Sequence, residues 1–96
     1  MEGTTVTVLS AKLTFYIAQA HSLKDKRMVA RSLIDKTRQR FNASVAEIGT
    51  LDTPQTLTIG IAVVSGDTAH AQNSRDGIIR YMEEHAAAEL TEVEIE

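Results

Sequence analysis

The chain has 96 residues and a mass of 10.5 kDa, and we expect residues 1–96 to form a single domain. Hydrophobic residues make up 43% and charged residues 24%, which is typical of a folded protein and excludes a disordered chain. The absence of cysteine excludes disulfides, thiol catalysis and zinc–thiolate sites, and it favours a reducing, cytoplasmic location. The net charge of −3 and the pI of about 5.6 differ from the strongly basic balance of most nucleic-acid-binding domains.

The charge is distributed unevenly along the sequence. Residues 24–40 hold seven basic and two acidic residues, a net charge of +5, so the rest of the chain carries −8. Six glutamates fall within the last fourteen residues, where there is no lysine or arginine. We therefore expect one positive face and one negative edge on the folded protein.

Hydrophobic and polar residues alternate over residues 6–17, which predicts a first strand. One face of this strand is apolar and is expected to be buried: Leu9, Ala11, Leu13, Phe15 and Ile17. Val6 and Val8 lie in the opposite phase, which predicts either a bulge or a second covered face at this end of the strand.

The first helix is predicted to begin at Ser22, which can accept a hydrogen bond from a backbone N–H of the first turn. Asp25 lies three residues further on, as in a capping box, although its side chain is shorter than the usual glutamate. Apolar residues then gather on one side of a helix of about five turns. These residues are Leu23, Ala30, Leu33, Ile34, Thr37 and Phe41.

A short second strand is expected at residues 43–48, and a turn follows it. Gly49 permits a tight bend in this turn, and Pro54 favours an extended conformation for the residue before it. Residues 56–63 alternate again, which predicts a third strand.

Asp67 is a suitable N-cap for a second helix at residues 68–85. The expected inner side of this helix holds Ala71, Ile78 and Met82, with Ser74 and His85 as further candidates. A fourth strand is predicted at residues 90–95, where apolar residues alternate with glutamates.

The predicted order of elements is β-α-β-β-α-β. Two helices are too few to cover both faces of a sheet, so both are expected on the face that carries the odd-numbered residues of the first and third strands. This order predicts an α+β, ferredoxin-like βαββαβ fold with a four-stranded antiparallel sheet and two helices on one face. The right-handed crossover rule places the first and third strands in the centre of the sheet.

Residues 20–27, with the sequence Ala-His-Ser-Leu-Lys-Asp-Lys-Arg, and residues 31–35 resemble the YlxP-like family of small bacterial proteins. Similar segments cover nearly the whole chain, at residues 40–42, 45–47, 60–65, 69–70 and 83–85. The resemblance implies a domain of unknown function with a ferredoxin-like fold. It also implies an association with RNA or the ribosome, because the genes of the family commonly lie among those for translation initiation and ribosome maturation.

One segment departs from the family pattern. Family members carry an Asp-Leu-Trp-Gln-like run before the third strand, whereas residues 51–55 of this chain read Leu-Asp-Thr-Pro-Gln and the chain has no tryptophan. A function that depends on that aromatic side chain is therefore not implied for this protein.

The basic first helix is the strongest candidate for a binding surface. On a wheel of about 100° per residue, Arg27, Arg31 and Arg38 fall within about 40° of one another beside the apolar side, and Lys24 continues this flank. Cations also crowd the helix N-terminus, where the dipole disfavours them, so an anion is expected to bind there, and phosphate suits arginine. We predict that five residues bind the phosphates of RNA: Lys24, Lys26, Arg27, Arg31 and Arg38. The helix-start signature beside them consists of His21, Ser22 and Asp25.

The expected partner of this helix is ribosomal RNA or a ribosomal subunit. The same residues also fit a solvated helix face that balances the acidic C-terminal strand, which is the commoner meaning of a charge run. A further alternative is a homodimeric protein-interaction or small-anion-binding module whose basic helix docks on an acidic protein surface. The uncharged sheet face opposite the helices fits packing of two protomers, although such a face is also often left to water.

Other classes of function have weaker support. Base stacking on the open sheet face needs several aromatic side chains, and Tyr16 is the only ring expected there. The histidines at positions 21, 70 and 85 are dispersed, so we expect no metal and no cofactor. No nucleophile elbow, phosphate-binding loop or dinucleotide motif occurs, so we expect no enzyme activity. The longest mostly apolar stretch is too short to span a bilayer, and we expect no membrane partner.

Overall fold

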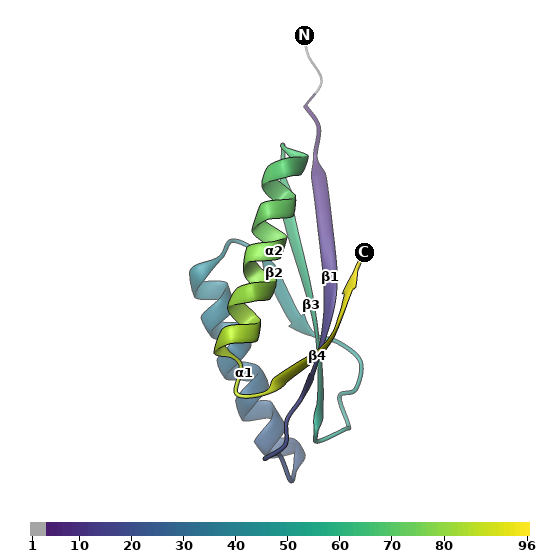
Figure 1. Cartoon of the computed structure of the whole chain (residues 1–96), viewed down its shortest axis with the longest axis vertical. Coiled ribbons are helices and arrows are strands. Elements are labelled where there is room, and N and C mark those ends of the chain that lie inside the picture. Colours follow the sequence, from purple (N-terminus) through teal and green to yellow (C-terminus); the bar gives the residue numbers. More distant parts are fainter. Residues whose placement is uncertain (1–3) are drawn as a thin grey trace.

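The computed structural model describes residues 4–96. Its elements, in chain order, are β1 (Thr7–Tyr16), α1 (Leu23–Arg40), β2 (Ser44–Glu47), β3 (Thr56–Ser65), α2 (Thr68–His85) and β4 (Glu89–Ile95). The strands form one antiparallel sheet in the order β2-β3-β1-β4, so β1 and β3 are central as predicted. Both helices lie on one side of this sheet, and the β2–β3 loop projects on the other side (Figure 1). The predicted ferredoxin-like α+β fold is confirmed.

The two central strands pair continuously, from Thr7 opposite Ser65 to Tyr16 opposite Thr56. Their odd-numbered side chains face the helices and form the centre of the core, together with one residue of β2 and the inner residues of both helices. The buried apolar side chains of the strands are Ala11, Leu13, Phe15, Val45, Leu57, Ile59, Ile61 and Val63. The helices contribute Ala30, Leu33, Ala71, Ile78 and Met82.

The irregularity expected near the start of β1 does not occur there. Val8 lies in regular register opposite Val64, and both side chains are exposed on the sheet face that the helices leave open. The register shift instead lies between β1 and β4, where Glu92 opposes Thr14 and Leu90 opposes Phe15. One extra residue of β4 is accommodated at this point, which bends the edge strand.

Both helices begin at the predicted caps. The Ser22 hydroxyl accepts a hydrogen bond from the backbone N–H of Asp25 at 3.1 Å, and the Asp67 carboxylate accepts one from the N–H of His70 at 3.2 Å. These bonds satisfy backbone donors that have no partner within the helix. The start of α1 is therefore determined locally.

Candidate nucleic-acid interface

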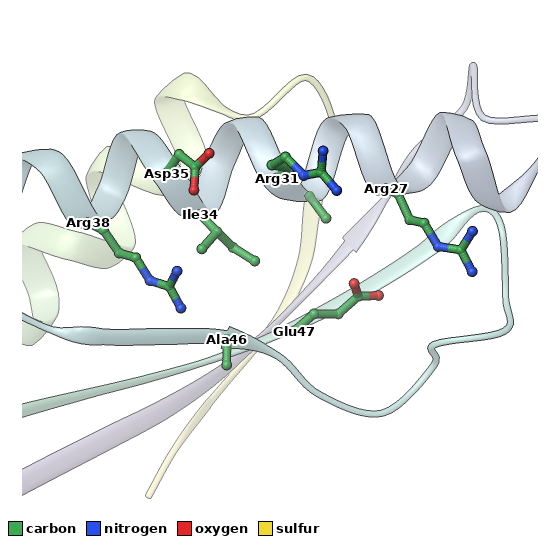
Figure 2. Close-up of a pocket in the computed structure, with 8 residues that line it drawn as sticks. Arg27, Arg31, Ile34, Asp35, Arg38, Ala46 and Glu47 are labelled. Atoms are coloured by element: carbon green, nitrogen blue, oxygen red, sulfur yellow. The ribbon is translucent and has the colours of Figure 1, made fainter.

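A groove of about 410 Å³ runs between α1 and the edge strand β2. Three arginines of α1 line it, with Arg31 between Arg27 and Arg38, and the groove faces β2 (Figure 2). Its other lining residues are Ala30, Ile34, Asp35, Ala46 and Glu47. The structure therefore brings three of the predicted phosphate-binding residues to one surface.

The spacing of these arginines follows from the helix itself. Arg31 lies about one turn, or about 6 Å, beyond Arg27, and Arg38 lies about two turns further along the axis. The adjoining side of α1 is buried against the core through Ala30 and Leu33, so the arginine flank is held beside β2. All three arginine residues are exposed, and their guanidinium groups are therefore available to a ligand.

Two carboxylates also line the groove, and within residues 4–96 only one of them has no cation at salt-bridge distance. Glu47 forms an ion pair with Lys26, whose ammonium lies 3.3 Å from its Oε2 atom. Asp35 is exposed on α1. Three guanidinium groups and one free carboxylate leave the groove with a net charge of +2.

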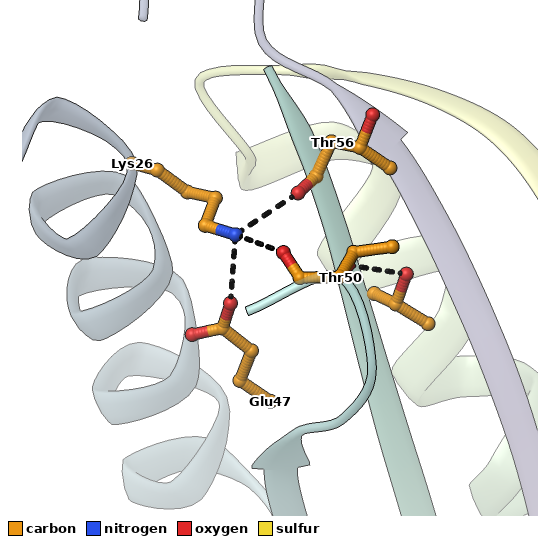
Figure 3. Close-up of polar contacts among 5 residues, drawn as sticks. Lys26, Glu47, Thr50 and Thr56 are labelled. Atoms are coloured by element: carbon orange, nitrogen blue, oxygen red, sulfur yellow. Dashed lines mark hydrogen bonds and ion pairs between the residues drawn. The ribbon is translucent and has the colours of Figure 1, made fainter. Parts of the chain in front are cut away.

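The prediction that Lys26 belongs to this exposed surface is wrong. Its side chain is 1% exposed, and its ammonium points into the interior between α1, β2 and the β2–β3 loop (Figure 3). There it donates to the backbone carbonyls of Thr50 and Thr56 and pairs with Glu47. Lys26 cannot reach a phosphate in solution, but it neutralises the glutamate that lines the groove.

Arg38 has a structural contact in addition to its place in the groove. Its Nη2 atom donates a hydrogen bond to the carbonyl of Val45, which belongs to the edge strand β2. A side chain that covers an edge carbonyl hinders the pairing of a further strand at that edge. The remaining N–H donors of the guanidinium are free for a ligand.

The predicted anion site at the N-terminus of α1 is not supported. Asp25 places its own carboxylate there, where its Oδ2 atom accepts a hydrogen bond from the N–H of His21 at 2.9 Å. The helix dipole stabilises this negative charge, and the charge in turn repels a second anion. Lys24 is exposed on the same flank as Arg27 but does not line the groove. Any phosphate site is therefore displaced from the helix end to its flank.

Two of the four Phe and Tyr side chains meet on the helix layer, which the sequence pattern did not reveal. The rings of Phe41 and Tyr81 meet edge-to-face with centroids 5.4 Å apart, and the His85 ring stacks on Tyr81 at 4.1 Å. Arg40 lies 5.3 Å from the Tyr81 centroid, so its charge is engaged away from the groove. The i, i+4 spacing of Tyr81 and His85 on α2 is a sequence signal for the contact between these two rings, but no such signal exists for Phe41.

Residues 4–96 were compared with the requirements of a metal site and of a membrane-spanning helix. No group of three or more histidine, cysteine, aspartate or glutamate side chains in this range is arranged to hold a metal ion. Neither α1 nor α2 has both the length and the apolar character that a membrane-crossing helix requires.

The fold and the groove together define a small ferredoxin-like domain with a basic helix flank. Over residues 8–95 the chain matches the family described as "Protein of unknown function (DUF503)", and it belongs to this family. It is 32% identical over 75 residues to the uncharacterized protein YlxP of Bacillus subtilis (strain 168), a match that covers 78% of this chain and 82% of that protein. The resemblance to the YlxP-like family is thus confirmed. Among solved structures, the de novo designed protein Ferredog-Diesel is similar over 100% of this chain and 90% of its own, with a TM-score of 0.47 and 5% identity.

Proposed function

We propose that this protein is a non-catalytic, cytoplasmic RNA-binding protein that contacts the phosphate backbone of ribosomal RNA or of a maturing ribosomal subunit. The observation that carries the proposal is the alignment of Arg27, Arg31 and Arg38 along one groove whose partly buried glutamate, Glu47, is paired with Lys26. Lys24 extends the same flank by about one turn and adds a fourth exposed cation.

Arginine suits this task because its planar guanidinium can donate two parallel hydrogen bonds to one phosphate. A row of such groups along a helix flank is expected to follow the RNA backbone and to read its shape rather than its base sequence. The open sheet face supplies one aromatic ring, Tyr16, and therefore does not favour recognition of splayed bases there. The proposal predicts binding that depends strongly on salt and weakly on sequence.

The test is filter binding of the purified protein to a ribosomal RNA fragment at 50 and 200 mM KCl. Four phosphate contacts correspond to a slope of about −3 in log K against log salt, which is about a 50-fold loss of affinity between the two conditions. The variant Arg27→Glu/Arg31→Glu is expected to weaken binding by about 30-fold at the lower salt, because each lost charge-assisted contact contributes about 1 kcal/mol.

The matched control is Lys36→Glu/Arg80→Glu, which makes the same charge change at exposed positions outside the groove. We expect this variant to lose much less affinity than the groove variant. Affinity that is independent of salt, or that survives reversal of Arg27 and Arg31, contradicts the proposal.

Co-sedimentation with ribosomal subunits at physiological salt tests the partner. Release of the protein by RNase supports the RNA assignment, because an RNA partner is destroyed by the nuclease. A complex that survives RNase and still requires Arg31 contradicts it and indicates an acidic protein surface as the ligand of the groove.

A further inference from the structure

Glu47 is the residue of the groove that phosphate binding does not explain. Its side chain is 18% exposed, and it lines the groove together with Arg27, Arg31 and Arg38 of α1. A carboxylate repels phosphate, so its place among phosphate-binding arginines weakens the binding of a ligand that offers phosphate alone. The ion pair with Lys26 offsets this charge but uses only part of the hydrogen-bonding capacity of the carboxylate.

The acceptor atoms of Glu47 are not all used within the chain. An ionised carboxylate has about four acceptor sites on its two oxygen atoms. The Oε2 atom is buried and lies 3.3 Å from the Lys26 ammonium. No arginine of the groove forms an ion pair with Glu47 in the part of the chain that the structure describes. Because the side chain is partly exposed, the Oε1 atom is left as an acceptor that faces the groove.

A free acceptor in this groove requires a ligand that carries a hydrogen-bond donor. The phosphate groups of a nucleic acid accept hydrogen bonds but do not donate them, and deoxyribose within a strand has no hydroxyl group. The ribose of RNA carries a 2′-hydroxyl, which donates as well as accepts and distinguishes RNA from DNA. An acceptor beside a row of phosphate-binding arginines therefore fits the backbone of RNA better than that of DNA.

The position of Glu47 along the groove also suits a ribose. Arg27 and Arg31 are about one helical turn, or about 6 Å, apart along the axis, which is close to the separation of successive phosphates in an RNA strand. The Glu47 carboxylate points from β2 toward α1 at a level between these two arginines (Figure 2). Ile34 and Ala46 give the groove an apolar part that can contact the carbon atoms of the sugar. A ribose between two bound phosphates is thus placed opposite Glu47.

We propose that Glu47 determines the specificity of the groove for RNA, because its Oε1 atom accepts a hydrogen bond from a ribose 2′-hydroxyl. This role rests on the proposed binding of RNA at the groove and adds to it the chemical group by which RNA is selected. Lys26 holds the carboxylate in place through the ion pair. Asp35 lines the same groove, but it is exposed and has no ion pair within residues 4–96, so its carboxylate is not fixed in this way.

Filter binding in low salt to three oligonucleotides of one ribosomal sequence tests this role. The probes are the RNA, the same RNA with fluorine in place of each 2′-hydroxyl, and the DNA with deoxyuridine in place of thymidine. Fluorine preserves the sugar conformation of RNA but cannot donate a hydrogen bond, so this probe separates the hydroxyl from the shape of the strand. We expect the wild-type protein to bind the RNA at least about tenfold more tightly than either other probe, because a hydrogen bond to a charged group is lost with them.

The double variant Lys26→Met/Glu47→Met removes the acceptor and leaves the net charge of the protein unchanged. We expect it to bind the RNA and the fluorinated RNA with similar affinity, close to that of the wild-type protein for the fluorinated RNA. Asp35→Asn is the matched control, because it removes the other carboxylate of the groove, and it is expected to keep the wild-type preference for RNA. Circular dichroism verifies that both variants are folded, and the comparison of the probes on the wild-type protein requires neither variant.

Three results contradict the role of Glu47. A wild-type protein that binds the RNA and the fluorinated RNA equally, with salt dependence still present, overturns this role and leaves the proposed binding of the RNA backbone intact. A preference for RNA that persists in the folded double variant overturns it as well, because the hydroxyl is then recognised elsewhere. Absence of salt-dependent binding to all three probes contradicts the proposed function itself, and the role of Glu47 with it.

Discussion

At the residue scale, Lys26 joins three segments that are distant in the sequence. Its ammonium contacts the Glu47 carboxylate of β2 and the carbonyls of Thr50 and Thr56 in and after the β2–β3 loop (Figure 3). The three N–H donors of the ammonium thus have three acceptors, which is the condition under which a buried charge is tolerated. The same contacts support Thr50, whose φ of 43° lies in the left-handed region that a side chain disfavours.

Replacement of one partner of this buried pair is expected to destabilise the fold. Lys26→Met leaves the Glu47 carboxylate without its cation and two carbonyls without a donor, and we expect the free energy of unfolding to fall by about 3 kcal/mol. In Lys26→Met/Glu47→Met the uncompensated charge is absent, so part of the loss is recovered. Urea unfolding followed by circular dichroism measures these two variants and the single variant Glu47→Met. A double variant whose loss equals the sum of the two single losses contradicts the coupling.

The burial of Lys26 could have been predicted, but its contacts could not. On the same helical wheel Lys26 falls at about 200° when Lys24 is set at zero, between Leu33 and Thr37, which are buried. The charge of Lys26 suggests a place beside the arginines, but its position on the wheel indicates a buried side chain. Glu47 is likewise in the phase of the buried Val45. The position of Thr50, however, depends on two consecutive left-handed residues in a loop, and no periodicity encodes them.

At the scale of the elements, local signals were sufficient for the strands and helices because each boundary has its own chemical cause. The cap at Ser22 and the alternation in β1 both act within a few residues, and both occur in the structure as predicted. The groove depends instead on how far α1 lies from β2, which packing of the whole core decides. Sequence therefore predicted the arginine flank but not Asp35, Ala46 and Glu47 around it.

The N-cap of α1 provides a test at this scale. Ser22→Ala removes the acceptor for the Asp25 N–H and is expected to lower the free energy of unfolding by about 1 kcal/mol, whereas Ser22→Gly loses only a few tenths. Thermal and urea unfolding of both variants measure the difference. Equal stability of Ser22→Ala and the wild-type protein shows that the hydroxyl does not cap the helix in solution.

At the scale of the whole molecule, the charges separate across the sheet. The basic groove lies at the β2 edge, and the glutamates of β4 lie at the opposite edge, about three strand spacings or about 14 Å away. The overall charge of −3 therefore describes neither edge. An RNA that binds at the groove is attracted locally and repelled by the distant edge, so its orientation on the protein is restricted.

This separation predicts a salt-dependent effect of residues that do not touch the RNA. Glu89→Gln/Glu92→Gln removes two exposed charges from the acidic edge and leaves the Lys12–Glu94 pair intact. The screening length is about 30 Å at 0.01 M ionic strength but about 8 Å at 0.15 M, so the distant charges act only at low salt. We expect RNA affinity to rise a few-fold at the lower ionic strength and to be unchanged at the higher one. A rise of equal size at both ionic strengths, measured by filter binding, indicates that β4 contacts the RNA directly and contradicts the assignment of the groove as the interface.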